Sequence, residues 1–214
     1  MSLFPELEDM PLHRLQEHFA ADTFYNGDLA ERELWLQEIA VRIAKSGAEG
    51  LSFLIRSIHN ADHARLRAIL LSFSFVPPPV ARERRGELTD LLLAFLASED
   101  PMLVAEAIEA LNCLDVADLE QNIVPFLTHQ SPYVVGSALR YFSRHYPQRA
   151  KPLLLEALRS KEPIVRQNAI DELDRLGCSE AVPYLRPLVY DEDKHVRQAA
   201  QTALADLEQG GPDR

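Results

Sequence analysis

Two imidazoles and a carboxylate stand close together in the segment His59-Asn60-Ala61-Asp62-His63. Histidine nitrogens and aspartate oxygens are common zinc ligands, so this segment could hold a metal ion if it were helical. It falls, however, where a turn between two helical patterns is expected, and no third ligand follows nearby in the sequence. We interpret it as a solvated turn and expect neither a metal site nor a cofactor.

The other residue types that could do chemistry are scattered. Cys113 and Cys178 are too far apart in sequence to indicate a thiolate metal site or a disulfide framework. Arg82, Arg84 and Arg85 cluster, but a short run of charges that also contains an acid is typical of a solvated surface. The sequence has no Gly-rich phosphate loop and no Gly-x-Ser-x-Gly turn. We identify no catalytic residue and expect a protein that is not an enzyme.

A pattern of apolar residues recurs with a period of 31 residues. Each of four copies has three such residues, spaced by four: Leu103, Ala107 and Leu111; Val134, Ala138 and Phe142; Val165, Ala169 and Leu173; Val196, Ala200 and Leu204. Spacing by four predicts a helix, and a period in this range is typical of repeats that bury their apolar faces against one another. The sequence therefore predicts an all-α fold, an α-solenoid of stacked antiparallel helix pairs.

The repeat pattern divides the chain into five segments. We expect an N-terminal cap, a region of divergent helical repeats, an inserted Pro-rich and basic loop, four regular repeats of about 31 residues and a disordered tail, over residues 1–27, 28–76, 77–86, 87–208 and 209–214. Pro101, Pro132 and Pro163 keep the same period and mark the start of three second helices.

Polar residues remain on each second helix once its apolar face is set aside. Those opposite the apolar arc should form a ladder across the concave surface that second helices line in a solenoid of helix pairs. The ladder comprises Glu109, Arg140, Arg144, Gln167, Asp171, Arg175 and Gln198. Its opposite charges could pair between neighbouring repeats, each exposed pair contributing about 0–1 kcal/mol, or they could recognise a partner. The sequence leaves both interpretations open.

Residues 193–200, Asp-Lys-His-Val-Arg-Gln-Ala-Ala, resemble the second-helix signature of HEAT-like repeats, and residues 162–169 match it nearly as well. The resemblance covers residues 87–208 closely and 28–76 loosely. It implies that the arginine after the valine bonds an acid of an adjacent repeat. It therefore implies structural roles for Val165, Arg166, Ala169, Val196, Arg197 and Ala200.

Short repeats of this type look most similar to HEAT-like repeats common in bacteria, among them subunits of phycobilin lyases and other phycobilisome-handling proteins. Another subgroup, the di-iron hydroxylases, takes its metal ligands from His-Glu dipeptides. This chain has no His-Glu dipeptide, which argues against that subgroup.

Charge and hydropathy limit the class of partner. The chain has 33 acidic and 22 basic side chains, a net charge of −11, which argues against a duplex nucleic-acid partner. No apolar run approaches the ~18–20 residues of a membrane span, and the acidic N-terminus does not resemble a secretory signal. We expect a cytoplasmic protein that binds neither nucleic acid nor membranes.

Our leading hypothesis is a non-enzymatic scaffold or adaptor whose concave face binds a protein or peptide, because a solenoid offers extended surface and little enclosed volume. The alternative, which rests on the resemblance, is a phycobilin lyase or chromophore-handling subunit with a tetrapyrrole partner. A HEAT-like protein that binds DNA lesions is a third hypothesis, disfavoured by the acidic charge.

Overall fold

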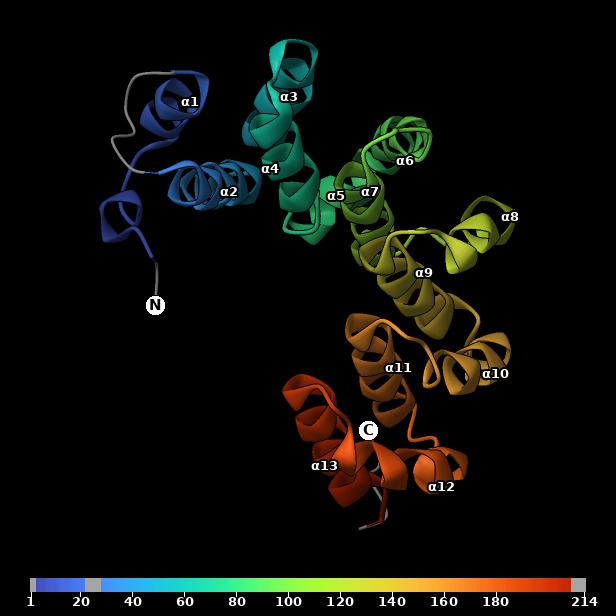
Figure 1. The fold of residues 1–214 in the computed structure, drawn as a ribbon. Coiled ribbons are helices and arrows are strands. Elements are labelled where there is room, and N and C mark those ends of the chain that lie inside the picture. Colours follow the sequence, from blue (N-terminus) through green and yellow to red (C-terminus); the bar gives the residue numbers. More distant parts are fainter. Residues whose placement is uncertain (1–2, 22–27, 209–214) are drawn as a thin grey trace. The chain divides into compact units, whose positions relative to one another are not determined.

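The computed structural model describes residues 3–21 and 28–208, and all regular secondary structure in these ranges is helical. The chain divides into two compact units, Met1–Val116 and Ala117–Arg214. Both are built from antiparallel helix pairs (Figure 1), which confirms the predicted all-α class of stacked pairs. The division falls inside the segment 87–208, which we expected to be one regular array.

Unit 1 begins with the 3₁₀ helix η1 (Pro5–Leu7) and α1 (Leu12–Ala20). The helices α2 (Leu29–Lys45), α3 (Ala48–Ser57), η2 (Ile58–Asn60) and α4 (His63–Phe73) follow. The last three are α5 (Pro78–Glu83), α6 (Arg85–Phe95) and α7 (Pro101–Cys113). The helices α2, α4 and α7 pack in succession and form the inner layer of this unit.

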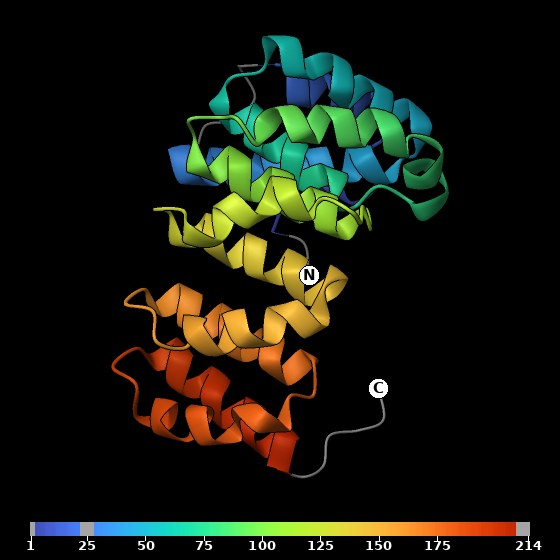
Figure 2. The same ribbon diagram turned by 90° about the vertical axis from the view of Figure 1, so that its right-hand side faces the viewer.

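Unit 2 contains three further pairs, stacked one on the next in Figure 2. The first helices are α8 (Glu120–Ile123) with η3 (Val124–Thr128), α10 (Pro147–Ala157), and α12 (Val182–Leu185) with η4 (Ser179–Ala181) and η5 (Arg186–Tyr190). The second helices are α9 (Pro132–His145), α11 (Pro163–Arg175) and α13 (Lys194–Glu208). Helix α11 packs against both α9 and α13.

Prolines explain two features of these helices. Pro101, Pro132 and Pro163 are the first residues of α7, α9 and α11, where the missing N–H has no helical partner to lose. Pro125 and Pro187 instead lie early in η3 and η5, within two first helices. Each of these prolines lacks the N–H for a helical hydrogen bond, and both first helices continue as 3₁₀ turns there after one α-helical turn, whereas α10 stays α-helical around Pro152.

The apolar positions of the repeat form the core. Ala107, Ala138, Ala169 and Ala200 are fully buried, and the larger apolar residues four positions before and after them are buried or nearly so. An alanine at this level lets neighbouring second helices approach closely, while the larger residues fill the space above and below it.

The expected loop at 77–86 is wrong, because most of this segment is helical. The segment that follows α4 ends at Pro77, whose backbone is extended, and α5 starts at Pro78. Two consecutive prolines suit the first turn of a helix, where φ near −65° is already set and no N–H is required. The proposed cap segment contains η1 and α1. Residues 1–2, 22–27 and the predicted tail 209–214 lie outside the described residues.

Candidate functional site

The candidate site lies on the second-helix layer of unit 2, which α9, α11 and α13 form together (Figure 1). Six of the seven predicted ladder residues belong to these helices. Arg144, Asp171, Arg175 and Gln198 are exposed, whereas Arg140 and Gln167 are partly buried. The seventh, Glu109, is on α7 in unit 1, where its carboxylate accepts a hydrogen bond from the Cys113 thiol.

Arg140 links α9 to α11 through a residue that the sequence did not single out. Its guanidinium donates to Asn168 Oδ1 at 2.7 Å and to Ser137 Oγ at 3.1 Å. A Cβ atom at Gly136 would lie only 2.4 Å from Asn168 Nδ2. Glycine therefore permits the close approach at which Asn168 meets Arg140, and the contact between the two helices is an arginine–amide hydrogen bond.

Arg175 forms a second connection between the same helices. It donates to Glu172 Oε2 at 2.6 Å within α11 and to Ser143 Oγ at 2.7 Å on α9. Glu172 is buried, so Arg175 supplies the charge that a buried carboxylate requires. The ladder residues at this end thus serve the packing of α9 against α11.

Asp171 differs from its neighbours because no cation bonds it directly within the described part of the chain. Partial removal of water, together with the negative charges of Glu172 and Asp174, raises the pKa of Asp171 above its ordinary value. A hydrogen bond from Gln167 and the charge of Arg140 oppose that rise only in part. Asp171 lies at an exposed position and its negative charge is only partly compensated, so a cation beside it would lower its pKa.

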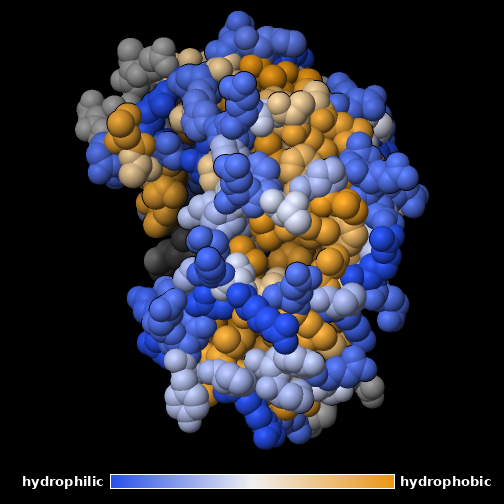
Figure 3. All heavy atoms as spheres, turned by 45° about the vertical axis from the view of Figure 1, so that its right-hand side comes forward, coloured by the Kyte–Doolittle hydropathy of each residue, from blue (hydrophilic) through white to orange (hydrophobic). Residues whose placement is uncertain are grey.

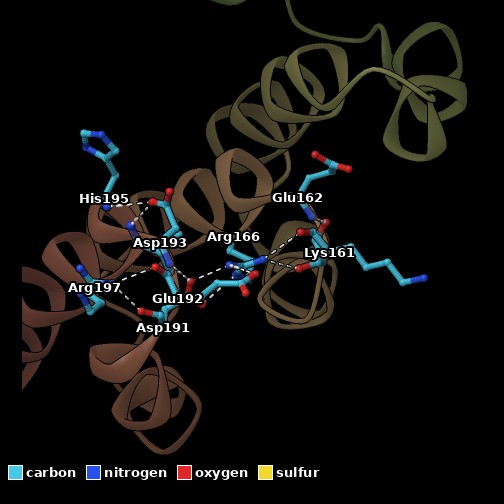
Figure 4. A network of polar contacts seen from close by, with 10 residues as sticks. Lys161, Glu162, Arg166, Asp191, Glu192, Asp193, His195 and Arg197 are labelled. Carbon is cyan, nitrogen blue, oxygen red and sulfur yellow. Dashed lines mark hydrogen bonds and ion pairs between the residues drawn. The ribbon is translucent and has the colours of Figure 1, made fainter.

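Arg166 occupies the other edge of unit 2, where first and second helices meet (Figure 4). Its Nε and Nη2 donate to the two carboxylate oxygens of Asp191, at 2.9 and 2.6 Å, in a bidentate pair. Its Nη1 donates to the carbonyl oxygens of Ser160 and Lys161. The side chains of Arg166 and Asp191 are only 8% and 7% exposed, so each charge depends on the other.

Arg197, one repeat later, bonds only to backbone carbonyl oxygens. Its Nη1 donates to the carbonyl oxygens of Asp191 and Glu192, at 2.7 and 3.0 Å. Burial opposes ionisation of Asp191, but the hydrogen bonds from Arg166 and from the Asp193 N–H, with the charges of both arginines, hold its pKa below the ordinary value. We propose that both arginines fix the turns between helices.

The His59–His63 segment runs from the 3₁₀ helix η2 through Ala61 and Asp62 to the first residue of α4 in unit 1. Asp62 caps α4 by accepting from the Arg65 N–H, and it also pairs with Arg32 and Arg65. Burial would raise the pKa of Asp62, but these hydrogen bonds and charges lower it overall. His63 contacts the carboxylate of Asp100, which caps α7. Across the described ranges, no group of three or more His, Cys, Asp or Glu side chains is arranged to hold a metal ion.

Three comparisons with known proteins bear on this arrangement. Residues 152–214 match the model of the HEAT repeats family. The C-terminal part of the chain is therefore similar to HEAT repeats. No curated protein matches the sequence. Among the described helices, none combines the length and the apolar character that crossing a membrane requires.

Solved structures share the fold of these repeats over most of the chain. Two engineered proteins from the Northeast Structural Genomics Consortium are 18% and 19% identical, each with a TM-score of 0.55 and 94% of this chain covered, over 98% and 100% of their own lengths. A designed armadillo repeat protein in complex with the peptide (KR)4 is 16% identical, with a TM-score of 0.52 over 92% of this chain and 99% of its own. Identities this low show the fold alone.

Sequence reasoning missed Asn168, Glu172 and the two serines of α9, Ser137 and Ser143. The sequence contains part of the pattern that would have identified them. Asn168 and Glu172 lie four residues apart on α11, and Gly136 in the middle of α9 is unusual for a helix and indicates a close neighbour. Nothing in the 31-residue period, however, indicates which polar residues of adjacent helices meet.

Proposed function

We propose that the protein is a non-enzymatic interaction module that binds a protein or peptide on the second-helix layer of unit 2. The observation that carries the proposal is the set of polar side chains that this layer exposes without using them between repeats, Asp171 and Gln198 above all. Residues at equivalent positions in other repeats differ, Arg140 and Thr202 corresponding to Asp171. A position that varies while the core repeats is available for recognition.

The geometry of the layer supports recognition of an extended partner. Three helices lie next to one another, so successive side chains of a bound peptide can meet successive helices. A structural neighbour carries a basic peptide, (KR)4. The exposed and only partly compensated carboxylate of Asp171 suits a cationic side chain. We propose a partner segment with at least one basic residue.

We also propose a cytoplasmic location in a bacterial cell. Neither Cys113 nor Cys178 is in a disulfide, and the first is exposed, as is usual in a reducing compartment. The bacterial origin rests on the similarity of the short repeats. Fractionation of cells expressing the tagged native gene would locate the protein, and recovery outside the cytoplasm would refute this assignment.

The binding test begins with peptides selected from a random displayed library against the whole chain. Binding of the selected peptides is then measured by calorimetry with the variant Asp171→Lys/Gln198→Ala. Both side chains are exposed, so the melting temperature should stay close to that of the native chain. We expect affinity to fall at least ~10-fold, equivalent to ~1.4 kcal/mol.

The matched control is Glu180→Lys/Gln148→Ala, which makes the same two kinds of change at exposed positions on the first-helix side. This variant should bind like the native chain. Loss of binding in the control with full binding in Asp171→Lys/Gln198→Ala would mean that the second-helix layer is not the recognition surface.

A further inference from the structure

A groove of about 550 Å³ opens on the turn edge of unit 2, and none of its lining residues belongs to the ladder. We call it the turn groove. Its apolar lining includes Leu127, Val135, Leu139 and Leu153, and its polar lining includes Glu156 and Glu162. Hydrophobic residues show between hydrophilic ones in the lower half of Figure 3, where unit 2 is drawn. The volume lies within the range of ligand sites in proteins.

The register of the repeats explains why the groove is present. Arg166 is the fourth residue of α11 and bonds Asp191 of the following repeat. Thirty-one residues earlier, the fourth residue of α9 is Val135, and the residue that corresponds to Asp191 is Ser160. Both Val135 and Ser160 line the turn groove. The groove therefore lies where the next pair of repeats places a buried arginine–aspartate pair.

The backbone of this site retains acceptors for a guanidinium. Arg166 donates to the carbonyls of Ser160 and Lys161, and the residues in register with those are His129 and Gln130, which also line the groove. Among the described residues, we find no hydrogen bond to the carbonyl of either one. Two acceptors thus occupy the positions that serve an internal arginine in the next repeat.

The negative charges at the groove belong to residues that do not recur at the same positions of the other repeats. Glu162 precedes α11 at the N-cap position, where Asp100 and Asp193 in other repeats cap their helices through short side chains. The Glu162 side chain makes no cap bond, and in Figure 4 its carboxylate points away from Arg166. Glutamate is a poor N-cap residue. Because Glu162 departs from the usual N-cap preference and does not stabilise the start of the helix in exchange, it indicates another role.

Glu156 is equally specific to this repeat, since Pro125 and Pro187 stand in register with it. Neither Glu156 nor Glu162 forms an ion pair within the described part of the chain, and Arg159, whose side chain also lines the groove, bridges to neither. The groove therefore combines an apolar lining, unpaired carboxylates and free carbonyl oxygens.

We propose that the turn groove binds the side chain of an arginine supplied by a partner polypeptide. The aliphatic stem lies on Val135 and Leu139, and the guanidinium donates to the carbonyls of His129 and Gln130 and to the carboxylate of Glu162. Arginine suits this set of acceptors better than lysine, because its planar fork presents five donors in fixed directions. The partner arginine thus takes the place that Arg166 fills in the next repeat.

The probe is the peptide acetyl-Ala-Leu-Arg-Leu-Ala-amide, titrated into the ¹⁵N-labelled whole chain and followed by NMR. Its control peptide has citrulline in place of arginine, which removes the charge and keeps the shape. We expect shifts at the backbone amides of residues 128–131 and 156–162, and binding at least ~10-fold weaker for the citrulline peptide. Equal binding of the two peptides would overturn the proposal.

Two variants locate the site. Val135→Arg/Ser160→Asp installs the internal pair of the next repeat and should abolish these shifts. Glu162→Gln changes one exposed side chain, leaves the fold unaffected and should weaken binding at least ~5-fold, while the matched control Glu180→Gln should not. Native-like binding by Glu162→Gln would overturn the proposal for the turn groove. Loss of binding only in Asp171→Lys/Gln198→Ala would also overturn it, and would leave the proposal for the second-helix layer intact.

Discussion

Arg166 shows how a single side chain can connect two repeats. It satisfies two backbone carbonyls of its own turn and both oxygens of Asp191 in the next repeat. Because both side chains are buried, removing Arg166 leaves the Asp191 carboxylate without its bidentate partner and with only the Asp193 N–H and the charge of Arg197 to offset its charge. The net attraction of this pair contributes less to stability than the free energy that is lost when one partner is removed.

Arg166→Ala should therefore destabilise the chain by about 3–5 kcal/mol, measured as the free energy of unfolding in urea. Arg197→Ala is the control, because Arg197 bonds only carbonyl oxygens and leaves no buried carboxylate behind. It should destabilise the chain less. Equal losses for the two variants would contradict a special role for the Arg166–Asp191 pair.

The same pair should give the stability a dependence on acid pH. Asp191 has a lower pKa in the folded chain than its ordinary value of about 3.9, so its contribution is complete above that value and is lost as the pH falls through the folded pKa. Asp191→Asn removes the titrating group. The difference in urea midpoint between native and Asp191→Asn chains should be constant from pH 7 to 5 and shrink below pH ~4. A constant difference down to pH ~2.5 would contradict this linkage.

At the scale of the helix, α9 and α11 meet through a glycine and an asparagine. Replacing Gly136 by alanine gains about 1 kcal/mol of helix propensity but places a Cβ atom 2.4 Å from Asn168 Nδ2. The Asn168 side chain must shift, which weakens its hydrogen bond to Arg140, of a kind that contributes about 1.5–3 kcal/mol. The two effects have opposite signs.

Gly136→Ala should accordingly destabilise the native chain and stabilise an Asn168→Ala chain by up to ~1 kcal/mol. A double-mutant cycle on thermal or urea unfolding measures this reversal. If Gly136→Ala had the same effect in both backgrounds, the close approach at Asn168 would not be what requires the glycine.

Other elements show how far a sequence can predict such contacts. The 31-residue period predicts the second helices and their buried alanines, because burial imposes the same residue at the same place in each repeat. It cannot predict α5, where three prolines suggest a loop although two of them begin a helix. It also leaves open whether Arg140 pairs with acids of the ladder, and it does not indicate the bond across to α11, which goes to Asn168. Such a choice depends on the distance between helices.

The turn groove was hidden from the sequence for a related reason. It lies where Val135 is in register with Arg166 and Ser160 with Asp191, and these differences have consequences only when adjacent repeats are stacked. Each of the two alone is an ordinary residue on a helix or turn. The functional candidates of a repeat protein are thus its departures from the repeat, interpreted at the interface where they fall.

At the scale of the whole molecule, the contacts between neighbouring repeats should determine the local stability. A destabilising substitution should therefore affect mainly the unit in which it lies. Gly50→Ala tests this in unit 1, because a Cβ atom there would lie 1.9 Å from the carbonyl oxygen of Ile43 and force α2 and α3 apart, at a cost of about 1–3 kcal/mol. Arg166→Ala is its counterpart in unit 2. Native-state hydrogen exchange of the Gly50→Ala chain should accelerate mainly in α2–α4, and that of Arg166→Ala mainly in α10–α13. Acceleration spread evenly over both units in either variant would mean that the chain unfolds as one cooperative block.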